Sequence, residues 1–332
     1  MLFEFDSDQR LLRETVRDVA AKECPPALIR DIVDRGADPA PLWETYVGLG
    51  WTELTEPGET VELGILFEEL GRATDPTPFL ATMSQFAPLV PGIGKLDRPG
   101  AAVYDGVTAA PDGTGWRLTG TAHHVLDGDR AERLAVVTGA GVFVVPAEAV
   151  SARRTSVFDP VLHLAEVTFD GVRLTDADRS TADVPRARQH ALTGLALHTV
   201  GACRRILDLV LEHVRTRKQF DTVIGSFQAV QHKAADMHIA IERAKALGFF
   251  AALCLAEDDP RRGLAASMAK AAAGECQSVV FRHGVQLFGA MGFTWENDLQ
   301  FALKRAKTGE LLLGGAAEHR AHVAEEYRAT LV

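Results

Sequence analysis

The sequence has 332 residues, of which 47% are hydrophobic and 24% are charged, and its formal net charge is -10. This composition is typical of a folded globular protein, which excludes disordered and fibrous classes, and the acidic balance argues against nucleic acid as the main partner. At roughly 150 residues per domain, the length predicts two or three domains.

Membrane and disulfide classes are also disfavoured. The longest notable apolar run, residues 246–256, is far shorter than the roughly 20 residues of a spanning helix, so we expect a buried helix and no membrane span. Residues 1–8 are acidic and lack the pattern of a signal peptide, which predicts a cytoplasmic location. We expect buried thiols rather than a metal site or disulfides, because no Cys-x-x-Cys pair occurs among the cysteines at positions 24, 203, 254 and 276.

The first part of the chain reads as helical. Apolar residues recur at helical spacing from Ser7 to Ala21, with Ser7 or Asp8 as the cap. A short helix over Pro41–Trp51 ends at Gly50, and a further helix covers Val61–Ala73. These patterns predict an N-terminal helical domain over residues 1–95.

Between residues 96 and 178 the pattern changes to short runs of β-branched or alternating residues bounded by glycine and aspartate. The predicted strands are Ala101–Tyr104, Gly115–Leu118, Leu134–Val137, Gly141–Val145 and Ala165–Phe169. This region is therefore predicted to be a central β domain. His123 and His124 are poor candidates for a metal or catalytic pair, because neighbouring residues of a strand point to opposite faces.

Residues 179–332 read as a C-terminal four-helix bundle. Helical patterns cover Gln189–Val214, Ser226–Ala256, Pro260–Gly289, Leu299–Leu313 and Ala316–Ala329. The fold class is therefore predicted to be α+β. The strand patterns of the central region count against the alternative, an all-helical interaction protein.

A loop between two of these helices carries Arg217, Lys218, Gln219 and Phe220. The guanidinium of Arg217 is a fixed fork of donors suited to a phosphate, and Phe220 offers a flat apolar surface. The alternative is a surface arginine at a helix end beside a core phenylalanine.

This Arg-x-Gln-Phe segment, followed by Ile224 and Gln228, resembles that of the acyl-CoA dehydrogenase family of tetrameric flavoproteins. In that family the segment touches the FAD that is bound mainly by a neighbouring subunit. The resemblance implies that Arg217, Phe220, Ile224 and Gln228 are cofactor-binding residues. Asp221 departs from the pattern, because the family usually has glycine there, and it brings a negative charge near the implied phosphate.

A second segment, from Gln286 to Glu296, resembles the family's Gln-x-x-Gly-Gly-x-Gly motif, which also serves the partner subunit's FAD. Gln286 and Gly289 match and are implied cofactor-binding residues, whereas Ala290 replaces the second glycine. Its glycines do not form a dinucleotide-binding fingerprint, because no strand precedes them. The resemblance extends over nearly the whole chain, including the helix that ends in Phe67-Glu-Glu-Leu-Gly-Arg-Ala73.

Other family elements are missing. The glycine-rich segment is cut short to Thr52–Thr60, and no counterpart of Thr-Glu-Pro followed by Gly-Ser-Asp leads into Tyr104. The aromatic-x-Thr element that packs on the flavin ring is replaced by residues 124–126. Because each unmet polar group of a buried flavin costs roughly 1 to 3 kcal/mol, this chain is not expected to hold the ring itself.

The position that spacing assigns to the family's catalytic base carries no carboxylate in this sequence. In many members a glutamate in a Tyr-Glu-Gly-Thr turn removes the α-proton of the thioester, and counting from Gly292 places Leu313 at that position. In other members the glutamate comes from the helix that precedes the Arg-x-Gln-Phe loop. The corresponding position in this sequence is near Ala191. Glu296 and Glu310 are the nearest acidic alternatives and read as solvated carboxylates, so we expect no catalytic residue and no metal ligand in this chain.

The chain keeps the motifs that serve a partner subunit's FAD but lacks the catalytic base. In this combination it resembles the non-catalytic chain of the heterotetrameric acyl-CoA dehydrogenases of actinobacterial steroid catabolism. This resemblance implies an α2β2 assembly with FAD, an acyl-CoA substrate and an electron-transfer flavoprotein. The alternative is a flavin-free homo-oligomer that binds acyl-CoA or serves as a scaffold.

Overall fold

The computed structural model describes residues 4–94 and 96–329. The helices are α1 (Ser7–Glu23), α2 (Pro26–Arg35), α3 (Ala40–Gly48), α4 (Thr60–Ala73), α5 (Val184–Thr216), α6 (Gln228–Ala256), α7 (Arg262–Phe288), α8 (Leu299–Leu311) and α9 (Ala316–Ala329). The strands are β1 (Gly100–Val103), β2 (Val107–Asp112), β3 (Gly115–Leu126), β4 (Arg133–Thr138), β5 (Gly141–Pro146), β6 (Ser151–Thr155), β7 (Leu164–Leu174), β8 (Arg179–Ser180), β9 (Lys218–Gln219) and β10 (Thr222–Val223). The predicted α+β class is confirmed.

The chain forms two compact units. The helical unit comprises Met1–Arg35, Pro57–Asp75 and Leu192–Val332, and the β unit comprises Gly36–Glu56 and Pro76–Ala191. Spatial contacts thus place α1, α2 and α4 with the C-terminal helices, and α3 with the strands. The division of the chain at residues 95 and 178 stays a prediction.

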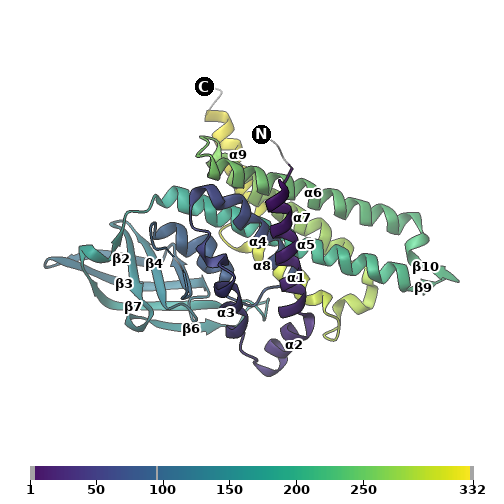
Figure 1. Cartoon of the computed structure of the whole chain (residues 1–332), viewed down its shortest axis with the longest axis horizontal. Coiled ribbons are helices and arrows are strands. Elements are labelled where there is room, and N and C mark those ends of the chain that lie inside the picture. The colour runs from purple at the N-terminus through teal and green to yellow at the C-terminus, as the bar shows by residue number, and fades with distance from the viewer. Residues whose placement is uncertain (1–3, 95, 330–332) are drawn as a thin grey trace. The chain divides into compact units, whose positions relative to one another are not determined.

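In the helical unit, α6 and α7 pack along each other and share one apolar core with α5 and α8 (Figure 1). Fully buried members of this core include Val200, Ile206, Met237 and Ala269. The β9–β10 hairpin joins α5 to α6 at one end of the bundle (Figure 1).

Two glycines allow α4 to lie directly on α5. A Cβ atom at Gly71 would overlap the carbonyl oxygen of His198, and one at Gly201 would overlap that of Glu68. The glycine in the segment Phe67–Ala73 is therefore required by the close approach of two helix backbones, which is a common use of glycine.

The β unit contains two four-stranded sheets, in the orders β1-β4-β5-β8 and β2-β3-β7-β6. Only β1 and β4 pair in parallel; the other pairs within these sheets are antiparallel. One apolar cluster contains Leu118 and Val167 of the second sheet together with Leu134 and Phe143 of the first. The two sheets therefore share a core.

All five predicted strands are present, and β3 and β7 extend well beyond the predicted Gly115–Leu118 and Ala165–Phe169. Strands β2, β6 and β8 were not predicted. Most of β2 and β6 lacks buried side chains, so these strands do not show the alternation of apolar and polar residues on which the prediction depends.

The predicted helices are confirmed, with corrections at their ends. Helix α2 was missed because Pro25 and Pro26 read as a break, whereas proline is well tolerated at the first helical position. The cap of α1 is Asp6, whose carboxylate accepts from the backbone N–H of Asp8 and Gln9, rather than Ser7 or Asp8. Ser226 does not cap α6, since its hydroxyl donates to the carbonyl of Val223.

The expectation that His123 and His124 face opposite sides was wrong. The β3–β7 register shifts between Ala122 and Val125, and His124 has a φ of 57°, so a β-bulge leaves both histidines exposed. All four cysteines are buried and free, as predicted. Among the described residues, no helix has the length and hydropathy to cross a bilayer, and no three potential metal ligands come together.

Candidate functional site

The Arg-x-Gln-Phe segment forms a tight hairpin. Gln219 pairs with Thr222, and the two turn residues, Phe220 and Asp221, have φ values of 54° and 60°. Positive φ at both central residues defines a type I′ turn, which aspartate tolerates but which is strained for a bulky residue. The Phe220 side chain is nevertheless 87% exposed, so it is not buried in a core that would offset that strain. The alternative interpretation, in which Phe220 is a core phenylalanine, is therefore wrong.

Arg217 lies at the base of this hairpin. Its N–H donates to the carbonyl of His213 at 2.9 Å, and its own carbonyl accepts from the N–H of Ile224 at 2.9 Å. The backbone of Arg217 is therefore fixed from both sides. Its side chain is exposed and makes no hydrogen bond or ion pair with any residue in the described ranges. The guanidinium fork is held in place at its base and is available to another molecule.

Ile224 and Gln228 follow the hairpin but differ in their surroundings. Ile224 is half-buried and packs against the helical core, which makes it a structural residue as well as a candidate contact. Gln228 is the first residue of α6 and is exposed. Phe227 is 38% exposed and lies edge-on to Phe220, with 6.2 Å between the ring centroids.

The second segment begins at the end of α7. Gln286 is exposed, and Gly289 ends the helix with φ 62° and ψ -142°, a backbone conformation accessible essentially only to glycine. A Cβ atom at Gly289 would meet nothing within 4 Å. The backbone conformation at position 289 thus requires glycine, and the space that a side chain would occupy there is open.

His213 links the two segments, and the sequence analysis missed it. Its ring stacks on Phe288, with 4.4 Å between centroids and an interplanar angle of 13°. The pKa of His213 is lowered by partial burial and by the positive charge of Arg217. The end of α5 and the Gln286–Gly289 segment therefore lie close together. The available signal was spacing, because His213 lies four residues before Arg217, in the last turn of α5, where its carbonyl accepts from the N–H of Arg217.

The loop at the predicted base position is tied down from within. Lys270 is fully buried, and its Nζ donates to the carbonyls of Glu310 at 2.7 Å and Gly314 at 2.8 Å. The buried ring of His319 contacts the carbonyl of Leu313 through Nε2 at 3.0 Å. Leu313 itself is half-buried with a φ of 56°. Burial lowers the pKa of Lys270 to about 8.

Glu310 has a structural role in the same region. Its carboxylate accepts from Lys307 Nζ at 2.8 Å and from the N–H of Ala316, the first residue of α9, at 3.3 Å. Although burial alone would raise its pKa, these bonds lower it, so Glu310 stays charged and engaged. Glu296 is exposed, and its carbonyl accepts from Arg30. Ala191 is fully buried.

In the β unit, the stretch around Tyr104, where the sequence has no counterpart of the family's Thr-Glu-Pro and Gly-Ser-Asp elements, is a short turn. Strand β1 ends at Val103 and β2 begins at Val107, so Tyr104, Asp105 and Gly106 make the whole connection. The hydroxyl of Tyr104 is buried and has no hydrogen-bond partner among the described residues, and the Arg188 guanidinium lies 5.9 Å from the ring centroid.

Comparison with known proteins gives consistent matches over nearly the whole chain. A family profile described as acyl-CoA dehydrogenase, C-terminal domain, matches residues 189–327. Acyl-CoA dehydrogenase IpdE2 of Mycobacterium tuberculosis (strain ATCC 25618 / H37Rv) is 31% identical over 324 residues, which cover 94% of this chain and 94% of that protein. The protein of the same name from Mycolicibacterium smegmatis is 29% identical over 322 residues, covering 94% and 96%.

Solved structures show the same fold. A chain of the ChsE4-ChsE5 complex from Mycobacterium tuberculosis matches with a TM-score of 0.89 at 24% identity, covering 99% of both chains. A chain of the Tcur3481-Tcur3483 steroid ACAD matches with a TM-score of 0.87 at 26% identity, covering 98% of both.

Proposed function

Because this chain belongs to the acyl-CoA dehydrogenase family, we propose that it completes the FAD site of a partner chain and carries no catalytic base of its own. The observation that carries the proposal is the uncommitted guanidinium of Arg217. It stands on an exposed hairpin that His213 links to the Gln286–Gly289 segment. Arg217 and Phe220 of the hairpin, and Gln286 and Gly289 of the second segment, are exposed, so they are open to a second chain.

These residues fit the pyrophosphate of FAD. Two charge-assisted hydrogen bonds from the Arg217 fork match a pyrophosphate, and Gly289 leaves room for a close approach. Phe220, Ile224, Gln228 and Gln286 would complete the contacts. The flavin ring does not fit this chain in the same way, because the turn from Tyr104 to Gly106 is too short to carry the family's ring contacts.

In the proposed reaction, an acyl-CoA loses its α-proton to a carboxylate and its β-hydride to FAD, which gives a 2-enoyl-CoA. We assign the carboxylate to the partner chain, because Leu313 occupies the predicted base position and Glu310 is engaged by Lys307 and Ala316. The role that we assign to this chain is to bind the pyrophosphate of FAD.

Two similar structures are complexes of two named proteins, and one of them is described as a steroid ACAD. We therefore propose an α2β2 heterotetramer that acts on a steroid side-chain CoA thioester and passes electrons to an electron-transfer flavoprotein in the cytoplasm.

Co-expression with a second acyl-CoA dehydrogenase chain of the same organism, one that carries the base, tests the proposal. We expect a yellow complex with flavin absorbance that oxidises an acyl-CoA, while this chain alone is inactive. A stable colourless homo-oligomer that ignores the second chain would instead support a flavin-free acyl-CoA binder or scaffold.

Replacement of Arg217 tests the role of the hairpin within that complex. Hydrogen bonds to charged groups are worth roughly 1.5 to 3 kcal/mol, so Arg217→Ala should weaken FAD binding by about tenfold to a hundredfold. Arg215→Ala is the matched control, because Arg215 is an exposed arginine at the same helix end. Equal FAD content in both variants would contradict the proposed contact.

A further inference from the structure

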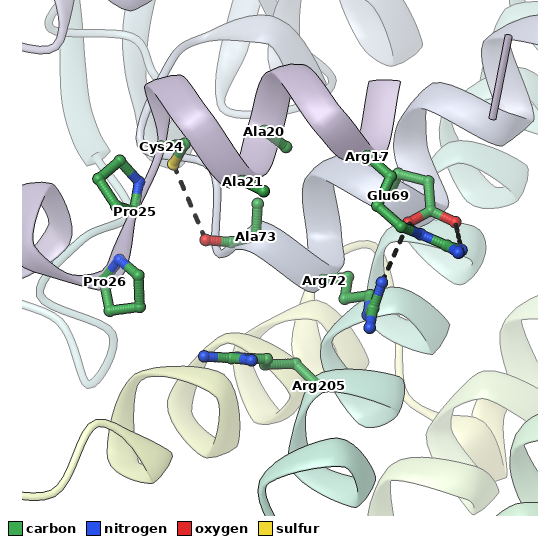
Figure 2. Close-up of a pocket in the computed structure, with 10 residues that line it drawn as sticks. All are labelled: Arg17, Ala20, Ala21, Cys24, Pro25, Pro26, Glu69, Arg72, Ala73 and Arg205. Carbon is green, nitrogen blue, oxygen red and sulfur yellow. Dashed lines mark hydrogen bonds and ion pairs between the residues drawn. The ribbon is translucent and has the colours of Figure 1, made fainter. Parts of the chain in front are cut away.

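A hollow of about 250 Å³ lies in the helical unit, and none of its lining residues belongs to the hairpin (Figure 2). Residues of α1, α2, α4 and α5, and of the turn between α1 and α2, line it. One wall is made of small or apolar residues: Ala20, Ala21, Cys24, Pro25, Pro26 and Ala73. The remaining lining residues are Arg17, Glu69, Arg72 and Arg205, so the hollow has one apolar and one charged side.

Two of the three arginines are already neutralised. The buried carboxylate of Glu69 accepts from Arg17 Nη2 at 2.7 Å and from Arg13 Nε at 2.8 Å. Burial alone would raise the pKa of Glu69, but these bonds outweigh it and lower the pKa, so this carboxylate is charged and satisfied. Arg72 donates from Nε at 2.8 Å and from Nη2 at 2.7 Å to Asp208.

Arg205 differs from both. It is half-buried and extends beneath the hollow toward Pro26 (Figure 2), and it has no hydrogen-bond or ion-pair partner in the described part of the chain. The lining thus carries three guanidinium groups and one carboxylate. A partly desolvated cation without a counter-charge is costly, so this arrangement favours an anion.

The opposite wall does not compete for that cation. The Cys24 thiol contacts the carbonyl of Ala73 at 3.9 Å, and burial raises its pKa, so the thiol stays neutral. The neighbouring prolines and alanines expose only apolar surface to the hollow. A ligand that fits must therefore combine a negative group with an apolar part.

We propose that this hollow binds a small organic acid, with its carboxylate on the Arg205 fork and a short apolar stem against the Pro25 and Pro26 wall. Since a water molecule occupies roughly 30 Å³, the hollow has room for about eight non-hydrogen atoms, which corresponds to a carboxylate of about four to six carbons. The inference is independent of the role proposed for Arg217.

Calorimetric or ligand-observed NMR titration of the full chain with hexanoate tests the site. Saturable binding is expected, and hexanamide, which has the same stem without the charge, should not bind. Arg205→Gln should weaken hexanoate binding by at least about tenfold, as expected for loss of a charged hydrogen-bonding pair. Ala21→Phe should also weaken it by filling the exposed side of the apolar wall without a change of charge.

Arg215→Gln is the matched control and should bind hexanoate like the wild type, because Arg215 is an exposed arginine of the same helix outside the hollow. Circular dichroism melting shows whether each variant is folded. Equal hexanoate binding by wild type and a folded Arg205→Gln variant overturns the proposal. Equal binding of hexanamide, or tighter binding of inorganic phosphate, overturns the combination of carboxylate and apolar stem.

Discussion

The β9–β10 hairpin and the loop between α8 and α9 solve the same backbone problem in opposite ways. Each contains non-glycine residues with positive φ: Phe220 and Asp221 in the hairpin and Leu313 in the loop. In the loop, a buried lysine and a buried histidine from other parts of the helical unit bind the carbonyls of Leu313, Gly314 and Glu310. In the hairpin, Phe220 is 87% exposed.

The difference indicates where another molecule is expected. A strained residue persists only when its surroundings over-determine it, and the loop supplies those surroundings from its own chain. In the hairpin, Phe220 meets only the edge of the Phe227 ring, and the side chain of Arg217 has no hydrogen-bond or ion-pair partner in the described ranges. We therefore interpret the hairpin as a surface completed by a second chain and its FAD, and the loop as a closed structural element.

Lys270→Met should give the largest effect, because it removes the contacts that close the loop. The variant keeps an apolar stem of similar length but leaves the carbonyls of Glu310 and Gly314 buried without a donor. At about 1 to 3 kcal/mol for each of the two orphaned carbonyls, the free energy of unfolding should fall by about 2 to 6 kcal/mol in urea titration. Lys22→Met, on an exposed lysine of α1, should leave it nearly unchanged.

The same lysine predicts an unusual dependence of stability on pH. Its pKa is about 8 in the folded chain, below the ordinary value of 10.5, because burial disfavours the charge. Between these values the unfolded chain binds a proton that the folded chain does not, so the free energy of unfolding should rise with pH, by up to about 2 to 3 kcal/mol. A neutral amine still has two N–H donors for the two carbonyls.

Urea titrations at pH 7.5 and pH 10 measure this rise, and Lys270→Met serves as the reference in which this contribution is absent. A wild type that loses stability relative to the variant over this range would show that Lys270 is not held as described.

At the hairpin, His213 should make FAD binding dependent on pH. Its pKa is lowered by burial and by Arg217, so it is neutral at pH 7.5. A pyrophosphate at Arg217 would offset that positive charge and favour protonation of His213. FAD affinity of the complex should therefore increase severalfold as pH falls from 8 to 6. His213→Phe, which keeps a ring on Phe288, should abolish the increase in fluorescence titrations with FAD.

Much of the fold was predictable from the sequence. Helical periodicity located α5 to α9, and the motif order predicted the acyl-CoA dehydrogenase fold, which solved structures of the family confirm. Proline at the start of α2 and the mostly exposed residues of β6 obscured those elements, because neither shows the period on which such a prediction depends.

The candidate site was predictable only in part. The order of the two motifs in the sequence identified Arg217 and Gln286 as candidates. The stacking of His213 on Phe288 could not be predicted in this way, because it brings together residues 75 positions apart and depends on the packing of α5 and α7. Likewise, Lys270 lies in a helix with no local sign that its amine closes a loop more than 40 residues away. The roles of the implied FAD contacts stay predictions.

Asp221 provides the finest test of the comparison, with the smallest expected effect. It lies four residues beyond Arg217, where the family usually has glycine, and an exposed charge near a pyrophosphate is screened by solvent and salt. Asp221→Gly should therefore tighten FAD binding by about twofold to threefold. The φ of 60° suits glycine, but glycine gains entropy in the unfolded chain, so the free energy of unfolding should change by less than about 1 kcal/mol.

Asp221→Asn separates charge from backbone in that test, because asparagine keeps the shape of the side chain and tolerates the same φ. Both variants should show the same gain in FAD affinity if the negative charge opposes the pyrophosphate. A gain in FAD affinity with glycine alone would show that the backbone conformation of the turn causes the effect. The residue type in the hairpin would then depend on backbone conformation, as in the α8–α9 loop, and not on a second molecule. Loss of affinity in both variants would show that Asp221 supports the site.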